Sequence, residues 1–143
     1  MRLGVTGGDV WQAVTDVLED EGFGNSLNPG RHTHLDEWVH TPFRRDSRDA
    51  LSSGMALECD IIPTGIREGW TANCEDGLAL ADEALRDEVA AKHPQVWARI
   101  LARCAFMRAQ LGVDVADEVL SLSNIAACFM PFWLSPDRML VAG

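Results

Sequence analysis

The chain has 143 residues, 47% of them hydrophobic, and 12 basic against 22 acidic residues give it a net charge of −10. This length predicts one compact domain with enough apolar content for a packed core. No apolar run reaches the about 18 residues of a membrane span, so we expect no transmembrane segment. The negative charge argues against nucleic-acid and membrane binding, and it is most often a solubilising feature, although it could attract divalent cations or a cationic peptide terminus.

The N-terminal sequence "MRLGVTGGDVW" has one basic residue and no long apolar stretch. We therefore expect no secretory signal, and the cytoplasm is the expected compartment. The four cysteines, Cys59, Cys74, Cys104 and Cys128, are widely spaced and form no CxxC pair. This spacing favours reduced core thiols over a zinc knuckle or a disulfide framework.

The first expected element is an amphipathic helix over about residues 7–21. Thr6 and Asp9 form a capping-box pattern, apolar residues recur at helical spacing, and Gly22 supplies a stop. A loop over 22–29 then leads into an extended segment through Trp38 and a polar loop. The next strand, "MALECDII" over residues 55–62, alternates, so Asp60 points away from the face of its apolar neighbours.

The rest of the chain begins with strands and continues as helices. Pro63 and Gly65 end the second strand, "GWTANC" is a possible short strand, and "EDGLALAD" from Glu75 reads as a hairpin or bent strand. A helix over 82–93 precedes a second that starts at Pro94 and stops at Gly112. The second helix has an apolar stripe of Trp97, Ile100, Cys104, Met107 and Leu111. The apolar, proline-broken tail over 124–142 is expected to pack against a surface.

The segment "NPGRHTHLDEW" has two histidines, His32 and His34, at a spacing that places both on one face of an extended strand. That arrangement permits a shared metal ion, although two histidines in a polar surface strand are more often simply solvated. Asp60 strengthens the metal reading, because a carboxylate in an apolar strand needs a cation, a metal or several donors unless it lies at a wet edge. Glu75 is either a further ligand or a turn acid before Gly77. One imidazole and two carboxylates would suit Mn, Co, Zn or Fe.

Four motifs in order resemble the pita-bread metallopeptidase family, which includes Xaa-Pro aminopeptidases, methionine aminopeptidases and creatinases. They are "GVTGGDV" at 4–10, "GRHTHL" at 30–35, "GMALECD" at 54–60 and "EDGLA" at 75–79. The resemblance implies an α+β, partial pita-bread fold with a curved antiparallel sheet and flanking helices. It also implies that residues 1–82 form the C-terminal lobe of a catalytic domain, with 83–143 packed on it as a helical C-terminal extension.

In that family two metal ions are held by two aspartates, one histidine and two glutamates, and they activate a water that attacks a peptide bond. Carried over by position, Glu75 matches the last glutamate, and Asp60 stands in place of the first. The histidine position falls on Arg31, which stays protonated and cannot ligate a metal. His32, the metal-ligand candidate, is one residue along and would face the other way unless a bulge shifts it. His40 in "VHTP" resembles a histidine that contacts substrate.

Two hypotheses follow from this resemblance. The chain is a metal-dependent aminopeptidase-like hydrolase of the Xaa-Pro type acting on a peptide substrate, or a truncated member that is inactive alone, since the two upstream aspartates have no counterpart. Alternatively it is a non-catalytic interaction or oligomerisation module derived from that fold, which Arg31 favours. An unrelated acidic inhibitor that mimics nucleic acid would explain the charge alone. Half of a two-lobed fold exposes a sheet edge, so we also expect a homo-oligomer or a missing N-terminal half as partner.

Overall fold

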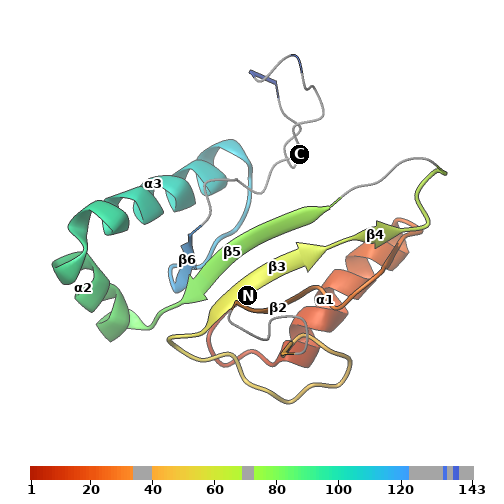
Figure 1. Ribbon diagram of the computed structural model, residues 1–143, viewed down its shortest axis with the longest axis horizontal. Coiled ribbons are helices and arrows are strands. Elements are labelled where there is room, and N and C mark those ends of the chain that lie inside the picture. The colour runs from red at the N-terminus through yellow and green to blue at the C-terminus, as the bar shows by residue number, and fades with distance from the viewer. Residues whose placement is uncertain (34–39, 69–72, 123–133, 135–136, 139–143) are drawn as a thin grey trace.

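The computed structural model describes residues 1–33, 40–68, 73–122, 134 and 137–138. Over these residues the chain is α+β, as expected, with helices beside antiparallel sheets (Figure 1). The helices are α1 (Gly7–Asp20), α2 (Glu83–Lys92) and α3 (Pro94–Gln110). The strands are β1 (Gly24–Asn25), β2 (Gly30–His32), β3 (Ala56–Ile61), β4 (Pro63–Thr64), β5 (Cys74–Leu80) and β6 (Val119–Ser121). Residues 69–72 of the possible short strand and most of the expected apolar tail lie outside the described residues.

The larger sheet has the strand order β2-β3-β5-β6 with every neighbouring pair antiparallel, and β1 pairs with β4 in a separate ribbon. Residues directly opposite each other in an antiparallel pair share a face. Arg31 stands opposite Glu58, and Asp60 stands opposite Glu75. Since Glu58 and Asp60 are two apart on β3, all four side chains lie on the same face of the sheet.

Helix α1 begins as the sequence predicts. The Asp9 backbone N–H donates to Thr6 Oγ1 at 3.2 Å, and the Thr6 N–H donates back to the Asp9 carboxylate at 3.0 Å. The hydrogen bonds from Thr6 lower the pKa of Asp9. Gly7 is required in the first turn because a Cβ there would lie 1.9 Å from the carbonyl oxygen of Pro42. The helix is thus seated closely on the loop that follows β2.

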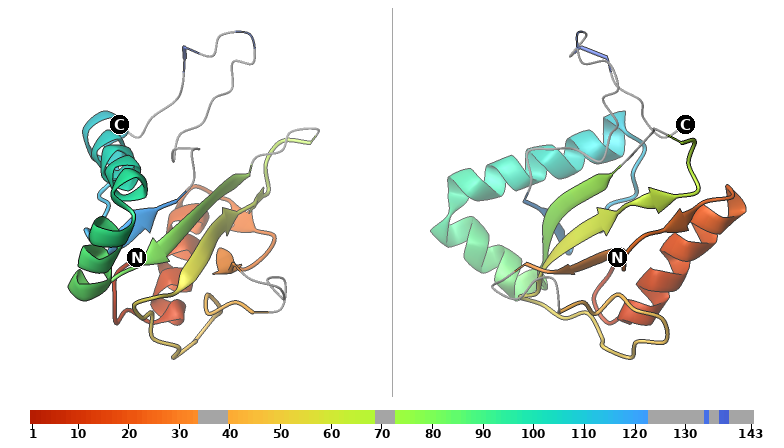
Figure 2. Two further views of the ribbon diagram at one scale, coloured as in Figure 1. Left: turned by 60° about the vertical axis from the view of Figure 1, so that its left-hand side comes forward. Right: turned by 45° about the vertical axis from the view of Figure 1, so that its right-hand side comes forward.

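Two apolar clusters lie on opposite faces of the larger sheet. Leu78 and Ala79 are successive residues of β5, so they point to opposite faces, and each packs in a different cluster. The cluster against α3 consists of Ala81, Ile100, Cys104, Met107, Leu111, Val115 and Leu120. The other consists of Val10, Phe43, Leu51, Leu57 and Leu80. Figure 2 shows α2 and α3 beside β5 and β6, while α1 lies toward β1 and β4 at the other side.

The helices of the second half and the alternation of β3 are confirmed, and the differences concern short strands. Strand β3 ends at Ile61, before Pro63, as expected, but Pro63 itself lies in the short strand β4, which pairs with β1 inside the segment expected to be a loop. Strand β6 was not predicted, since three residues are too few to show a period. Glu75 lies within β5, opposite Asp60, and not in a turn. Each difference depends on a pairing between residues distant in sequence.

The described cysteines only partly match the expectation of core thiols. Cys104 is buried and Cys59 is half-buried, but Cys74 is exposed, so the expectation is wrong for Cys74. Its position as the first residue of β5 places it at the end of the sheet, where less of the chain covers it. Within the described ranges, no helix is both long enough and apolar enough to cross a membrane.

Candidate functional site

The charged side chains on one face of the larger sheet form an ion-pair cluster, which consists of Arg31, Glu58, Asp60 and Glu75. Arg31 Nη2 lies 2.8 Å from Glu58 Oε2 and 3.1 Å from Glu75 Oε1. Arg31 Nη1 donates to Asp60 Oδ2. One guanidinium thus binds carboxylates from the two neighbouring strands, β3 and β5.

Backbone pairing explains why these side chains meet. Strand β2 approaches β3 closely because Gly30 has no side chain, and a Cβ there would lie 2.1 Å from the carbonyl oxygen of Glu58. Gly30 also has a φ of +146°, which L-residues with side chains rarely adopt. The glycine therefore sets the backbone position from which Arg31, the next residue, extends toward Glu58 and Asp60.

Burial makes the cluster electrostatically strong. The Arg31 side chain is 13% exposed and that of Asp60 only 5%, whereas Glu75 is 42% exposed at the rim. Burial by itself lowers the pKa of the Arg31 guanidinium, but the hydrogen bond to Asp60 and the charges of Glu58 and Asp60 outweigh it and raise that pKa above its ordinary value. Arg31 is therefore a permanent cation, and the three carboxylates leave the cluster with an excess of negative charge when all are ionised.

A divalent metal ion does not fit among these side chains as they stand. The guanidinium has no lone pair to donate to a metal, and its charge repels a second cation. It also already binds an oxygen of each of the three carboxylates. One further feature of the cluster is that Asp60 Oδ1 is buried without a hydrogen-bond partner among the described residues. Over those same ranges, no group of three or more His, Cys, Asp or Glu side chains is placed to hold a metal ion.

The structure divides the site residues named from the sequence into two groups. Asp60 and Glu75 meet around Arg31, whereas His32 faces the other side of β2. The pairing of β2 with β3 is regular over all three residues of β2, so no bulge shifts His32 toward the carboxylates. His34 lies outside the described residues.

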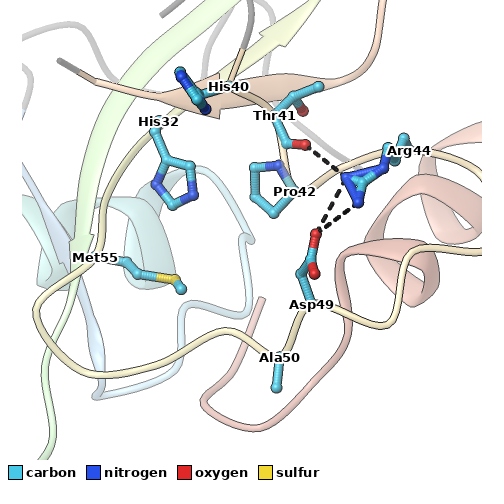
Figure 3. Close-up of a pocket in the computed structure, with 8 residues that line it drawn as sticks. All are labelled: His32, His40, Thr41, Pro42, Arg44, Asp49, Ala50 and Met55. Carbon is cyan, nitrogen blue, oxygen red and sulfur yellow. Dashed lines mark hydrogen bonds and ion pairs between the residues drawn. The ribbon is translucent and has the colours of Figure 1, made fainter. Parts of the chain in front are cut away.

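His32 instead lines a pocket of about 590 Å³ together with His40 (Figure 3). The His32 backbone N–H donates to the His40 carbonyl oxygen at 2.9 Å, which brings the two residues side by side. In Figure 3 the His32 ring projects between Pro42 and Met55. At the far side of the pocket, Arg44 Nη2 lies 3.0 Å from an oxygen of Asp49.

This histidine pocket brings two imidazoles together but holds no excess of charge on its lining residues. The cation of Arg44 is already neutralised by Asp49, and both side chains are about half exposed. His40 is exposed to solvent. His32 and His40 therefore do not form one reaction centre with Asp60 and Glu75.

The sequence reasoning did not include Glu58 in the site, although its carboxylate lies 2.8 Å from the Arg31 guanidinium. The signal was present, because Glu58 precedes Asp60 by two residues and must share its face of a strand. Comparison of this chain with protein-family models, with curated proteins and with solved structures finds no match in any of the three. Function must therefore be argued from the geometry of the site.

Proposed function

We propose that this chain is a non-catalytic interaction module, built as a partial pita-bread-type fold in which Arg31 takes the place that a metal ion holds in the metallopeptidases. The observation that carries the proposal is the ion-pair cluster. A side chain that belongs to the protein, Arg31, already binds a carboxylate oxygen of each of Asp60, Glu58 and Glu75. The carboxylates that would hold a water-activating metal ion in a hydrolase instead form ion pairs that link strands β2, β3 and β5.

The chemistry of arginine supports this reading over hydrolysis by the isolated chain. Metal-assisted hydrolysis needs carboxylates that are available to a cation and an open position for water. Arg31 removes the first condition, because its bonds to Asp60 and Glu58 lie in a poorly exposed site where a competing cation would meet a fixed positive charge. The position of His32 on the other face removes the imidazole from the set.

One observation favours the second candidate, a metal-dependent aminopeptidase-like hydrolase. Asp60 and Glu75 stand directly opposite each other on neighbouring strands, which is the arrangement that the family resemblance implies for two of its ligands. A hydrolase of this kind would need further ligands from a partner chain and a displaced Arg31.

Isothermal titration of the full chain with Mn²⁺, Co²⁺ and Zn²⁺, paired with hydrolysis of Xaa-Pro peptides, separates the two candidates. The proposal expects no stoichiometric uptake and no turnover by the unaltered chain. Arg31→Ala should bind a divalent ion measurably, because it leaves the carboxylates without their cation. The matched control is Arg44→Ala, which removes an exposed arginine from another ion pair and should not create a metal site. Stoichiometric metal and peptide hydrolysis in the unaltered chain would overturn the proposal.

A further inference from the structure

The histidine pocket contains three side chains that can donate electron pairs to a metal ion. His32 and His40 supply imidazole nitrogens, and Met55 supplies a thioether sulfur. His32 follows Arg31 on β2, and successive residues of a strand point to opposite faces, so this pocket lies across the sheet from the ion-pair cluster. Its donors therefore need to be considered apart from the carboxylates around Arg31.

Strand pairing places the three residues in a row. The His32 backbone N–H donates to the His40 carbonyl oxygen at 2.9 Å, so residue 40 runs beside β2. On the other side His32 stands opposite Leu57 of β3, and directly opposed residues share a face. Met55 precedes Leu57 by two residues and packs against the same apolar cluster, so it lies on that face too. His32 and Met55 are thus diagonal neighbours, which long side chains can span.

The side chains of this row approach one another within the pocket. Figure 3 shows the His32 ring between His40 and the Met55 thioether. The Ser52 backbone N–H donates to Met55 Sδ at 3.3 Å, which holds the sulfur in position. A thioether sulfur has two lone pairs, so this hydrogen bond leaves one of them for a metal ion. The pocket thus presents two nitrogens and one sulfur from three different segments of the chain.

The charges around the pocket favour a soft ion of low charge. Asp49 also lines it, but its carboxylate accepts hydrogen bonds from Arg44 at 3.0 and 3.1 Å and one from the Ser47 hydroxyl. The remaining donors, two imidazoles and a thioether, are neutral. Hard divalent ions prefer anionic oxygen ligands, whereas thioether and imidazole donors suit Cu(I).

We propose that His32, His40 and Met55 form a binding site for one cuprous ion, Cu(I), with two imidazole nitrogens and one thioether sulfur as its ligands. Cu(I) is stable at low coordination number, so it needs no carboxylate to complete the site. His40 is exposed, which gives the ion a path from solvent. The site uses no residue of the ion-pair cluster, and the inference therefore goes beyond the proposed function and does not depend on it.

Nuclear magnetic resonance of the full chain labelled with ¹³C at the methionine methyl groups tests the site directly. Cu(I) is diamagnetic, so the signals of its ligands shift without being lost. The Met55 methyl signal, identified by its absence from Met55→Leu, should shift and reach its final position at about one equivalent of Cu(I), added under argon with ascorbate. A Met55 signal that does not move overturns the inference.

Competition with the chelator bicinchoninate measures the affinity and identifies the ligands. Met55→Leu and His40→Ala should each weaken Cu(I) binding by about tenfold or more. The matched controls are Met107→Leu, in α3, and His93→Ala, an exposed histidine between α2 and α3, and both should stay within about twofold of the unaltered chain. Leucine has nearly the volume of methionine, so both methionine variants should fold. Equal affinities for Met55→Leu and Met107→Leu would overturn the inference.

The thiols of the chain also have affinity for Cu(I), and Cys74 is exposed. The titrations are therefore repeated with Cys74→Ser, in which Cu(I) should still shift the Met55 methyl signal. Loss of that shift in Cys74→Ser would show that the exposed thiol holds the ion, and would overturn the site. The proposed function fails by a separate result, stoichiometric Mn²⁺, Co²⁺ or Zn²⁺ with peptide hydrolysis, because those ions would bind the carboxylates on the other face of the sheet.

Discussion

Replacing Arg31 by methionine tests whether the ion-pair cluster supports the fold. The change keeps much of the aliphatic length of the side chain but removes the cation, which leaves Asp60, 5% exposed, and Glu58, 19% exposed, without their shared partner. Removing one member of a buried ion pair typically costs about 3–5 kcal/mol. The ion pair with Glu75, which is 42% exposed, contributes little to stability. We therefore expect the free energy of unfolding to fall by an amount near the lower end of that range, about 3 kcal/mol.

The assay is urea unfolding followed by the fluorescence of the five tryptophans. The matched control is Arg44→Met, whose partner Asp49 is about half exposed, and it should lose about 1 kcal/mol or less. Adding Asp60→Asn to the Arg31 variant should recover part of the loss, because a neutral amide at this buried position does not need a cation.

Two results would refute this reasoning. One is an Arg31→Met variant that is no less stable than Arg44→Met, which would mean that water screens the cluster as fully as it screens the exposed pair. The other is a double variant, Arg31→Met with Asp60→Asn, that recovers none of the loss, since that would assign the loss to packing of the arginine stem and not to the buried carboxylate.

Three further outcomes are expected from the structure. Gly30→Ala should lower the free energy of unfolding by more than about 3 kcal/mol, because its Cβ would lie 2.1 Å from the Glu58 carbonyl oxygen. Gly54→Ala is the control, since Gly54 has open space around it and a φ of +88°, and it should lose about 1 kcal/mol. Equal losses in urea unfolding would contradict this expectation. Phe43→Ala should lose about 3–5 kcal/mol because the ring is fully buried, and a loss below 1 kcal/mol by calorimetry would show that the cluster is loosely packed. Burial raises the pKa of the Cys59 thiol from 9.0 to about 11, so the folded state disfavours the thiolate. The free energy of unfolding should therefore decline by about 2–3 kcal/mol as the pH rises from about 9 to about 11. Cys59→Ala should remove this part of the decline.

Local chemistry made much of the fold predictable from the sequence. The Thr6 capping box and the apolar stripe of α3 are patterns within one turn or one helix, so they could be read without knowledge of the rest of the chain. The opposite orientation of Arg31 and His32 followed from the period of an extended strand alone. These predictions needed no information about which segments pair.

Features that depend on pairing between distant segments could not be read in this way. Strand β4 exists because β1 lies beside it, and neither of these two-residue strands has a period of its own. That Arg31 binds Glu58 as well as Asp60 depends on the register of β2 against β3, which a single sequence does not state. The sequence could suggest which side chains share a face of a strand, but the neighbouring strand decides which of them come into contact.

The cation of the ion-pair cluster, Arg31 on the edge strand β2, is covalently part of the chain, and this sets how the fold responds to its surroundings. A bound ion is lost on dilution, competes with other ions and is removed by chelators, whereas a guanidinium on β2 is present once in every molecule at any dilution. The ion pairs that Arg31 makes with β3 and β5 therefore need no bound ion. These ion pairs depend instead on Gly30 and on the register of β2 against β3, which position the Arg31 guanidinium. The cation of the cluster is therefore present as soon as the chain is synthesised.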